Sequence, residues 1–407
     1  MGHKPAQDSS LSAETNQHGN PSRAAGYYAA YVALGLVTAS LGPTLPGLAE
    51  HTSVSLSTAG LLFTTRSLGF TLGSLYIGRS YDRFPGHRVM AGMLLLMTGM
   101  LVLAPTTTLF WVLALVMFLL GAGEGTLDVG GNTLLVWLMR EEVGPFMNAM
   151  HFFFGAGAFF SPVIIAQALE ISGDITWAYW ALAFLVAPIA LWLLRVPSPS
   201  APNGDDKDTK GELRPWLVFL VAAFFFLYVG AEAGYGGWVF TYAKSADFGG
   251  LNLTDATAAY LTSAFWGALT LGRLFSIPMA ARLRPSVILF ADLAGCLLSV
   301  GIILLWPASE LALWAGSIGL GLFMASIFPI TIAFAERRMP ISGRITGFFF
   351  VGVGTGAMTV PWLVGQLFES LGPQALLYTL TAVLLLGVGV LASLLISSSS
   401  RLASPSG

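Results

Sequence analysis

Long apolar runs alternate with short polar segments along the chain, in a pattern that predicts membrane-spanning helices. A helix needs roughly 20 apolar residues to cross the hydrocarbon layer of a bilayer. Runs of that kind occur twelve times, six on each side of a polar stretch in the middle of the chain. We therefore expect an all-α integral membrane protein. The expected spans are residues 26–48, 57–77, 88–106, 109–138, 147–170, 175–195, 215–241, 256–280, 286–306, 310–335, 344–369 and 374–397.

Polar segments divide the chain into five expected parts. Residues 1–25 contain Gln, Ser, Asn and Pro without an apolar core, which predicts a disordered cytoplasmic tail. Residues 26–196 form the expected N-terminal six-helix bundle, and residues 197–213, rich in Pro, Ser, Asp and Lys, the expected cytoplasmic linker. Residues 214–398 form the expected C-terminal bundle, and residues 399–407 a second cytoplasmic tail.

The two halves share short sequence repeats. The segment Gly155-Ala-Gly-Ala recurs 199 positions later as Gly354-Thr-Gly-Ala, and Thr71-Leu-Gly recurs at the same offset as Thr270-Leu-Gly. A duplicated hydrophobic half is typical of secondary transporters, which hold their substrate between the halves near the bilayer midplane. The repeated small residues predict surfaces where helices pack closely.

Composition supports a membrane protein and excludes several other classes. Hydrophobic residues make up 55% of the chain and charged residues 10%, whereas a soluble domain carries roughly 25% charge. The net charge of −2 argues against a nucleic-acid partner. The single cysteine, Cys296, rules out an intrachain disulfide and a thiolate-cluster metal site. No His-Glu-x-x-His pattern occurs. We expect no enzymatic activity and no cofactor.

The distribution of basic residues predicts the orientation in the membrane. With both termini in the cytoplasm, 16 of the 19 Lys and Arg residues fall on the cytoplasmic side and only Lys244 in an outer loop. Because Lys and Arg resist translocation, this orientation is the expected one. We expect a multi-pass protein of the inner or plasma membrane. We also expect a monomer. The 16 residues are Lys4, Arg23, Arg79, Arg83, Arg88, Arg140, Arg195, Lys207, Lys210, Arg214, Arg282, Arg284, Arg337, Arg338, Arg344 and Arg401.

The loop after the second expected span carries a family motif. It reads Gly78-Arg-Ser-Tyr-Asp82-Arg83, followed by Gly86 and Arg88. This resembles the signature of the major facilitator superfamily, with one extra residue before the second glycine. The resemblance implies two pseudo-symmetric six-helix bundles, and a role for Asp82 and Arg83 as a latch that locks one conformation. An ordinary positively charged cytoplasmic loop is the alternative.

Polar residues within the spans narrow the resemblance to one branch. The residues concerned are Arg66, Glu124, Asp128, Asn132, His151, Glu232, Tyr235 and Trp238. Their pattern is similar to that of the fucose permease and sodium-dependent glucose transporter-like branch. The first span, however, holds no acid, and Phe154 stands where a polar residue is expected, so proton-coupled fucose uptake is not transferred.

Charges within the spans are the candidate functional groups. An ionised side chain at mid-bilayer costs about 2.5–3.5 kcal/mol on insertion scales, so each one needs a partner or a wet cavity. Glu124, Asp128 and Asn132 follow one another at intervals of four, which places them on one helix face that we expect to line the central cavity. A purely structural polar seam is the alternative. Arg66, at similar depth, pairs with Asp128 or Glu124, or else binds an anionic substrate.

The coupling ion is left open between a proton and sodium. His151 is a plausible proton acceptor facing Asp128, since an unperturbed imidazole titrates near neutral pH. Alternatively, Asp128, Asn132 and backbone carbonyls form a sodium site. In that case the glycine-rich stretch from Gly125 to Gly131 loosens the helix and frees the carbonyls, as broken helices do in transporters.

The second half contributes a candidate gate and a candidate latch. Three glycines after Glu232 predict a soft outer end of the seventh span that bends over the substrate. Tyr235 and Trp238 would stack on a sugar ring, or else belong to an interfacial aromatic belt. Arg273 and Asp292 are expected to pair as a closing latch.

These features together predict a secondary active transporter. We expect it to move a small polar solute, a sugar or polyol, by alternating access, with the solute and the lipid bilayer as its partners. An exporter of drugs or lipid-like compounds is a second hypothesis, although Ser161-Pro-Val-Ile-Ile lacks the Gly-Pro-x-x-Gly-Gly motif of drug antiporters. A transport-silent membrane sensor is a third.

Overall fold

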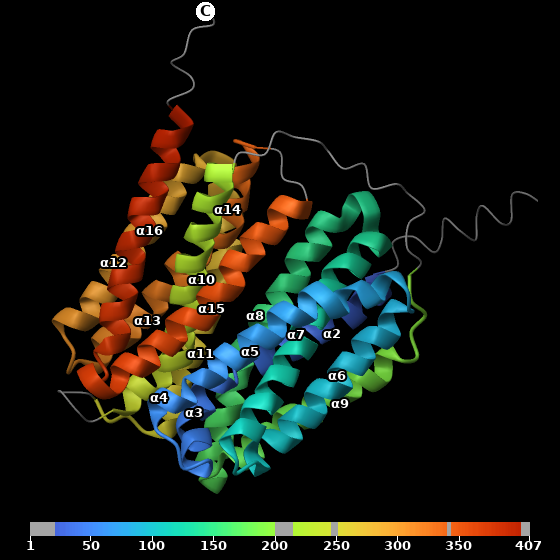
Figure 1. The fold of residues 1–407 in the computed structure, drawn as a ribbon, viewed down its shortest axis with the longest axis horizontal. Coiled ribbons are helices and arrows are strands. Elements are labelled where there is room, and N and C mark those ends of the chain that lie inside the picture. The colour runs from blue at the N-terminus through green and yellow to red at the C-terminus, as the bar shows by residue number, and fades with distance from the viewer. Residues whose placement is uncertain (1–20, 200–214, 246–250, 340–342, 400–407) are drawn as a thin grey trace, which may run out of the picture.

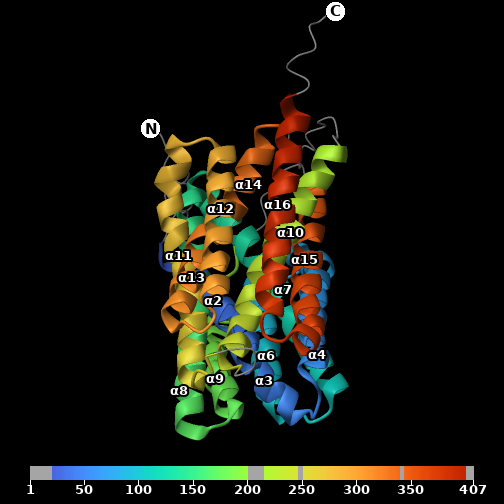
Figure 2. The ribbon, with the colours of Figure 1, turned by 90° about the vertical axis from the view of Figure 1, so that its left-hand side faces the viewer.

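A computed structural model describes residues 21–199, 215–245, 251–339 and 343–399. Within these ranges the regular structure is entirely helical. The long helices run side by side in one bundle (Figure 1). The first helix begins and the last one ends at the same end of the bundle, which we call the terminal end (Figure 2). The opposite end is called the far end.

The helices of the first half correspond to the first six expected spans. Short 3-10 turns at 78–82, 104–106 and 140–142 and a π-helical turn at 73–77 join or extend them. The helices are α2 (Pro21–Thr38), α3 (Leu41–His51), α4 (Leu56–Ala59), α5 (Leu61–Leu72), α6 (Gly86–Leu103), α7 (Phe110–Met139), α8 (Val143–Ser172) and α9 (Ile175–Leu193).

The helices of the second half correspond to the other six expected spans. They are α10 (Pro215–Lys244), α11 (Asp255–Arg282), α12 (Pro285–Leu305), α13 (Glu310–Met324), α14 (Ile327–Glu336), α15 (Gly343–Leu371) and α16 (Ala375–Ser399). The breaks inside the first and tenth spans follow from proline chemistry. Pro43 and Pro329 have no N–H to donate to the carbonyls of Ala39 and Ala325 four residues earlier, and the helix is interrupted next to each of them.

Length and composition support membrane crossing for most of these helices. Within the described ranges, nine helical segments are long and apolar enough to cross a bilayer, and α2 with α3 forms a tenth that is bent by 47°. The two other expected spans differ for local reasons. The span of α4 and α5 is broken into short pieces, and α11 is long but carries more polar side chains. The all-α membrane fold is thus as expected.

One boundary differs from expectation, and several lie outside the described residues. Helix α2 begins at Pro21, so the last part of the expected N-terminal tail is helical. A proline at the start of a helix is favoured because its missing N–H would have no partner there. The expected tail before Pro21, most of the linker and the last residues, 400–407, are not described.

The repeated glycines bring helices of the same half into backbone contact, as their spacing predicts. A Cβ atom on Gly157 of α8 would lie 2.1 Å from the carbonyl oxygen of Val32 in α2. In the second half, a Cβ atom on Gly356 of α15 would lie 2.1 Å from the carbonyl oxygen of Phe226 in α10. The same helix pair therefore packs in the same way in each half.

The other glycine of each repeat contacts the opposite half. Gly155 faces the side chain of Thr270 in α11, and Gly354 faces that of Thr71 in α5. The two glycines are 199 positions apart, and so are the two threonines. These paired glycine–threonine contacts are therefore related by the internal repeat, and they join the two halves at equivalent places.

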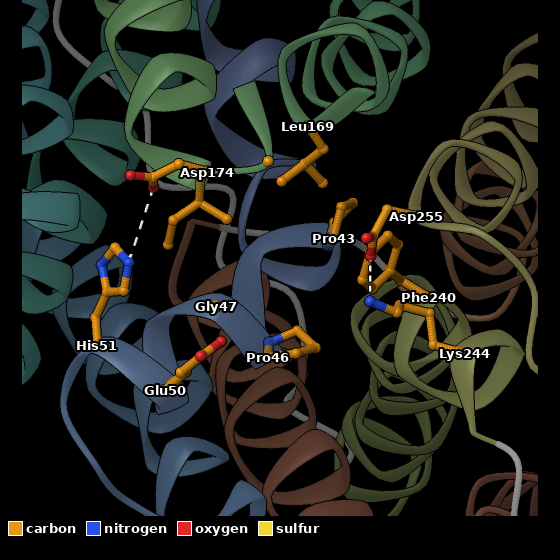
Figure 3. Close-up of a pocket in the computed structure, with 12 residues that line it drawn as sticks. Pro43, Pro46, Gly47, Glu50, His51, Leu169, Asp174, Phe240, Lys244 and Asp255 are labelled. Carbon is orange, nitrogen blue, oxygen red and sulfur yellow. Dashed lines mark hydrogen bonds and ion pairs between the residues drawn. The ribbon is translucent and has the colours of Figure 1, made fainter. Parts of the chain in front are cut away.

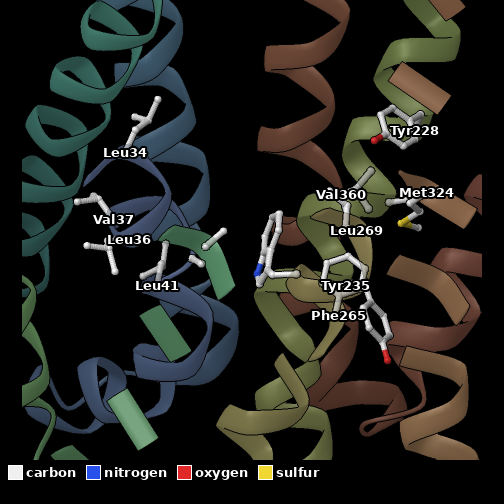
Figure 4. Packing of buried hydrophobic residues seen from close by; sticks show 14 of the residues in the cluster. Leu34, Leu36, Val37, Leu41, Tyr228, Tyr235, Phe265, Leu269, Met324 and Val360 are labelled. Carbon is white, nitrogen blue, oxygen red and sulfur yellow. The ribbon is translucent and has the colours of Figure 1, made fainter. Parts of the chain in front are cut away.

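One cluster of buried apolar side chains runs through both halves. Figure 4 shows Leu34, Val37 and Leu41 of α2 and α3 gathered on one side, and Leu269 and Met324 of α11 and α13 among the side chains on the other. All of them are at most 2% exposed. Burial of this kind stabilises a helix pair mainly through close packing, because lipid tails are as apolar as leucine.

The halves meet mainly at the far end. Gln366 of α15 donates a hydrogen bond to the carbonyl of Ser57 there, and Gln167 of α8 bonds to Tyr260 of α11. Toward the terminal end, the contacts continue as far as the paired glycine–threonine contacts. Beyond them α5 and α15 diverge, as seen in Figure 1. The structure is therefore closed at the far end and splayed at the terminal end.

The close approach of α7 to α5 yields a stability prediction. A Cβ atom on Gly121 would lie 1.9 Å from the carbonyl oxygen of Arg66, whereas one on Gly92 of α6 meets nothing within 4 Å. We expect Gly121→Ala to lower the free energy of unfolding by about 1–3 kcal/mol or more through overpacking. We expect Gly92→Ala to leave it unchanged or raise it by up to about 1 kcal/mol. Melting of the purified variants in detergent checks this, and equal melting temperatures would contradict it.

Candidate functional site

A buried ion pair joins α5 and α7 in the first half. The Arg66 guanidinium donates from Nε to Glu124 Oε2 at 2.7 Å and from Nη2 to Glu124 Oε1 at 2.6 Å. It also donates to the carbonyl of Val37 at 2.7 Å, and Thr38 donates to Glu124 Oε1 at 2.9 Å. Arg66 is 8% and Glu124 3% exposed. Both charges are thus neutralised and hydrogen-bonded in a dry environment.

This geometry decides among the alternatives for Arg66. Its partner is Glu124 and not Asp128. Because the guanidinium is buried against its own carboxylate, direct binding of an anionic substrate by Arg66 finds no support. Glu124 is buried in the same ion pair, so it is not a carboxylate that is open to a cavity.

Asp128 lies one turn further along α7 in a different environment. Its Oδ1 accepts hydrogen bonds from the Tyr31 hydroxyl at 2.9 Å and from Asn132 Nδ2 at 3.3 Å. Asn132 Nδ2 also donates to the Tyr31 hydroxyl at 2.7 Å. Tyr31 is fully buried, whereas Asp128 and Asn132 remain partly exposed. The carboxylate is therefore held in place by two uncharged donors and keeps one side open.

His151 of α8 belongs to the same group. Its ring lies edge-on to the Tyr31 ring, with the centroids 5.5 Å apart, so Tyr31 lies between His151 and Asp128. We call Tyr31, Asp128, Asn132 and His151 the Asp128 cluster. Sequence reasoning missed Tyr31, which is one of three tyrosines near the start of an apolar span, with Tyr27 and Tyr28. The one sequence feature related to Tyr31 is Gly131 of α7, which leaves room for the Tyr31 ring: a Cβ atom there would lie 2.2 Å from it.

The glycines of α7 do not loosen the helix, contrary to expectation. Helix α7 is continuous from Phe110 to Met139. Gly130 makes room for the Tyr81 ring and Gly125 for the carbonyl of Phe70, so their function is close packing. A sodium site at Asp128 and Asn132 would thus have to use side-chain oxygens and not carbonyls freed by a break.

Helix α10 is continuous as well, so the expected soft gate is not formed. The glycines after Glu232 make room for neighbours: Gly236 for the Trp266 ring of α11, and Gly237 for the Phe63 ring of α5. Glu232 itself accepts a hydrogen bond from Tyr228 one turn earlier and is partly exposed. It is therefore an accessible carboxylate on a rigid helix.

Tyr235 and Trp238 are fully buried, which excludes both expectations for them in this structure. The Tyr235 hydroxyl bonds to Ser317 of α13, and the Trp238 indole N–H donates to the carbonyl of Pro361 at 2.8 Å. Trp238 also lies against Phe63 of the first half. Neither ring has a free face for a sugar or for the lipid interface. Trp238 instead helps to close the far end.

The expected latch between Arg273 and Asp292 is absent from the described ion pairs. Asp292 of α12 accepts a hydrogen bond from Ser326, at the bend between α13 and α14. Arg273 of α11 is partly exposed and forms no ion pair with a described residue. In the other expected latch, Arg83 is exposed, and the side chain of Asp82 lies outside the described part of the chain.

A polar pocket of about 330 Å³ lies at the far end, between α3, α9, α10 and α11 (Figure 3). His51 faces Asp174 at 3.8 Å on one side, and Lys244 pairs with Asp255 on the other. The backbone N–H of Thr176 donates to the Asp174 carboxylate and holds its pKa below the usual range. Sequence reasoning missed this pocket because its residues are far apart along the chain.

Comparison with known proteins identifies the kind of molecule. The sequence profile of the Major Facilitator Superfamily matches residues 27–340. The chain is 30% identical over 378 residues to sodium-dependent glucose transporter 1 of Xenopus laevis, covering 85% of this chain and 76% of that protein.

Solved structures share the fold. The chain is similar to a single-residue mutant of the nucleoside transporter NupG, with a TM-score of 0.73 and 14% identity over 91% of this chain and 98% of that one. It is also similar to a bacterial homolog of the human lysosomal transporter Spinster, with a TM-score of 0.70 and 14% identity over 95% of this chain and 100% of that one.

The buried ion pair leads to a prediction about stability. We expect Glu124→Gln to lower the free energy of unfolding by about 3–5 kcal/mol, because it leaves the Arg66 charge buried without an anion. Replacing both residues by Met should cost less than Glu124→Gln alone. Lys244→Gln in the more exposed Lys244–Asp255 pair serves as the control and should cost less than about 1 kcal/mol.

Reversible unfolding in mixed detergent micelles measures these differences. The loss of stability in the double Met variant is compared with the sum of the losses in Arg66→Met and Glu124→Met. Equality of the two would show that the pair does not act as a unit.

Proposed function

The chain belongs to the major facilitator superfamily, and we propose that it moves a sugar or polyol across the membrane by alternating access, driven by a cation gradient. It is a multi-pass membrane protein and a transporter of small molecules, not an enzyme. The observation that carries the finer proposal is the contrast between two carboxylates on α7. Glu124 is neutralised by Arg66, whereas Asp128 is partly exposed and held only by uncharged donors.

Asp128 is proposed as the coupling group. Hydrogen bonds from Tyr31 and Asn132 stabilise its ionised form while one side stays accessible. If the terminal end closed and excluded water, the carboxylate would be left charged in an apolar layer, which is costly. A bound cation removes that cost, so closure with the cation bound is favoured. The cation is a proton or sodium, and the names of the relatives favour sodium.

The contacts between the halves support alternating access. The two six-helix halves are proposed to move as units about the paired glycine–threonine contacts, with Asp82 and Arg83 locking the terminal end when it closes. The basic residues favour a cytoplasmic terminal end, so this conformation would be open to the cytoplasm. A monomer suffices for the mechanism, because both halves lie in one chain.

The first functional prediction concerns Asp128. Asp128→Asn keeps an oxygen that accepts from Tyr31 but cannot carry the charge, so we expect a folded protein without gradient-driven accumulation. Uptake of radiolabelled glucose, sorbitol and gluconate into proteoliposomes, under a sodium or a pH gradient, measures this. Accumulation should fall to the level of empty vesicles, while the melting temperature shifts by only a few degrees.

The matched control is Glu310→Gln, which changes an exposed carboxylate at the start of α13. It should leave accumulation unchanged. Normal accumulation by Asp128→Asn would remove Asp128 from the coupling role.

The second functional prediction tests closure at the far end. Ser57 and Gln366 lie on opposite halves and are joined by a hydrogen bond. In a Ser57→Cys/Gln366→Cys variant, a short bifunctional thiol reagent should hold the far end closed and stop transport, and a reductant that cleaves the link should restore it. The native Cys296 is fully buried and should not react. Each single-cysteine variant is a control. Undiminished transport after complete cross-linking would refute the proposal that this contact opens during transport.

A further inference from the structure

Arg273 of α11 differs from the other arginine within the spans. Arg66 is bound bidentately by a carboxylate, whereas no carboxylate among the described residues lies within ion-pair distance of Arg273. A guanidinium within the apolar layer is costly unless it faces water or a counter-charge. Arg273 is partly exposed, so its guanidinium is not sealed inside the protein.

Helix geometry places Arg273 opposite His151. The contact of Gly155 with Thr270 fixes α8 against α11, and the two helices are antiparallel. One turn from this contact toward the terminal end lie His151 on α8 and Arg273 on α11. The charge of Arg273 acts on the His151 ring, in agreement with this placement. The two side chains therefore face each other from different halves.

Helix α10 packs against α11, which carries Arg273. The Arg273 charge also acts on Tyr228, whose hydroxyl is engaged by Glu232. Arg273 is thus flanked by an imidazole from the first half and by a phenol from the second. All the nitrogens of a guanidinium are donors, and they match the two oxygens of a carboxylate.

We propose that Arg273 binds an acidic group of the transported solute, with His151 opposite it, so that the solute is a sugar acid and not a neutral sugar. This rests on the proposed function, and it specifies the substrate class. In this conformation Glu232 is engaged by Tyr228 and forms no ion pair with Arg273, so a neutral solute would bring no counter-charge to the guanidinium. A carboxylate supplies the counter-charge, in the same way that the coupling cation supplies one for Asp128.

The test compares glucuronate with glucose on the purified protein. Thermal-shift titration should give stabilisation by glucuronate that competes with other sugar acids, and little or none by glucose. Arg273→Gln should weaken the apparent affinity for glucuronate by about tenfold or more, because a charge-assisted contact is lost. Arg273→Lys keeps the charge but not the bidentate geometry, and should weaken it less. Arg282→Gln, at the exposed end of α11, is the matched control and should change nothing.

Each outcome decides the matter. Equal stabilisation by glucose, unaffected by Arg273→Gln, would overturn the acidic substrate but keep sugar transport, and would leave Glu232 as the partner of Arg273 in another conformation. No response to any sugar, polyol or sugar acid would overturn both proposals. If Arg273→Gln does not fold, the comparison of glucuronate with glucose on the unaltered protein and on Arg273→Lys gives the answer.

Discussion

The organisation of this protein depends on one constraint: no charge can stay in the apolar layer unless it is neutralised or reached by water. Arg66 and Glu124 satisfy the constraint by pairing, and they fasten α5 to α7. Asp128, Glu232 and Arg273 satisfy it by remaining partly exposed. The first solution joins two helices of one half, and the second leaves charged groups that the proposed mechanism uses. The constraint therefore separates the paired charges from those that we propose to be functional.

Much of the fold could be predicted because membranes limit the choices. Apolar length alone locates the helices, and the spacing of repeated glycines locates their close contacts, as Gly155 and Gly354 demonstrate. The face that carries Asp128 also follows from helical periodicity. What the sequence could not decide is the partner of Arg66, because the two candidate carboxylates on α7 are only one turn apart. That choice depends on side-chain packing across helices.

Other features escaped prediction because one residue type has several uses. A glycine in a membrane helix can mark a flexible point or a tight contact, and here those beside Tyr31 and Trp238 are tight contacts. Aromatic residues have a similar ambiguity. The sequence predicts that Trp238 stacks on a sugar ring or belongs to the interfacial aromatic belt, yet its side chain is buried at the closed far end. Tyr31 carries the hydroxyl that organises Asp128, and nothing in its apolar neighbourhood distinguishes it.

The position of the paired glycine–threonine contacts has a mechanical consequence. Gly155 lies 12 residues from the start of α8 and 17 from its end, and Gly354 lies 11 and 17 residues from the ends of α15. At 1.5 Å per residue, each of these helices extends about 17–18 Å from the contact toward the terminal end and about 26 Å toward the far end. A rigid rotation about these fulcra would therefore displace the far end about one and a half times as much as the terminal end. The mouth that opens on that side would be the wider of the two.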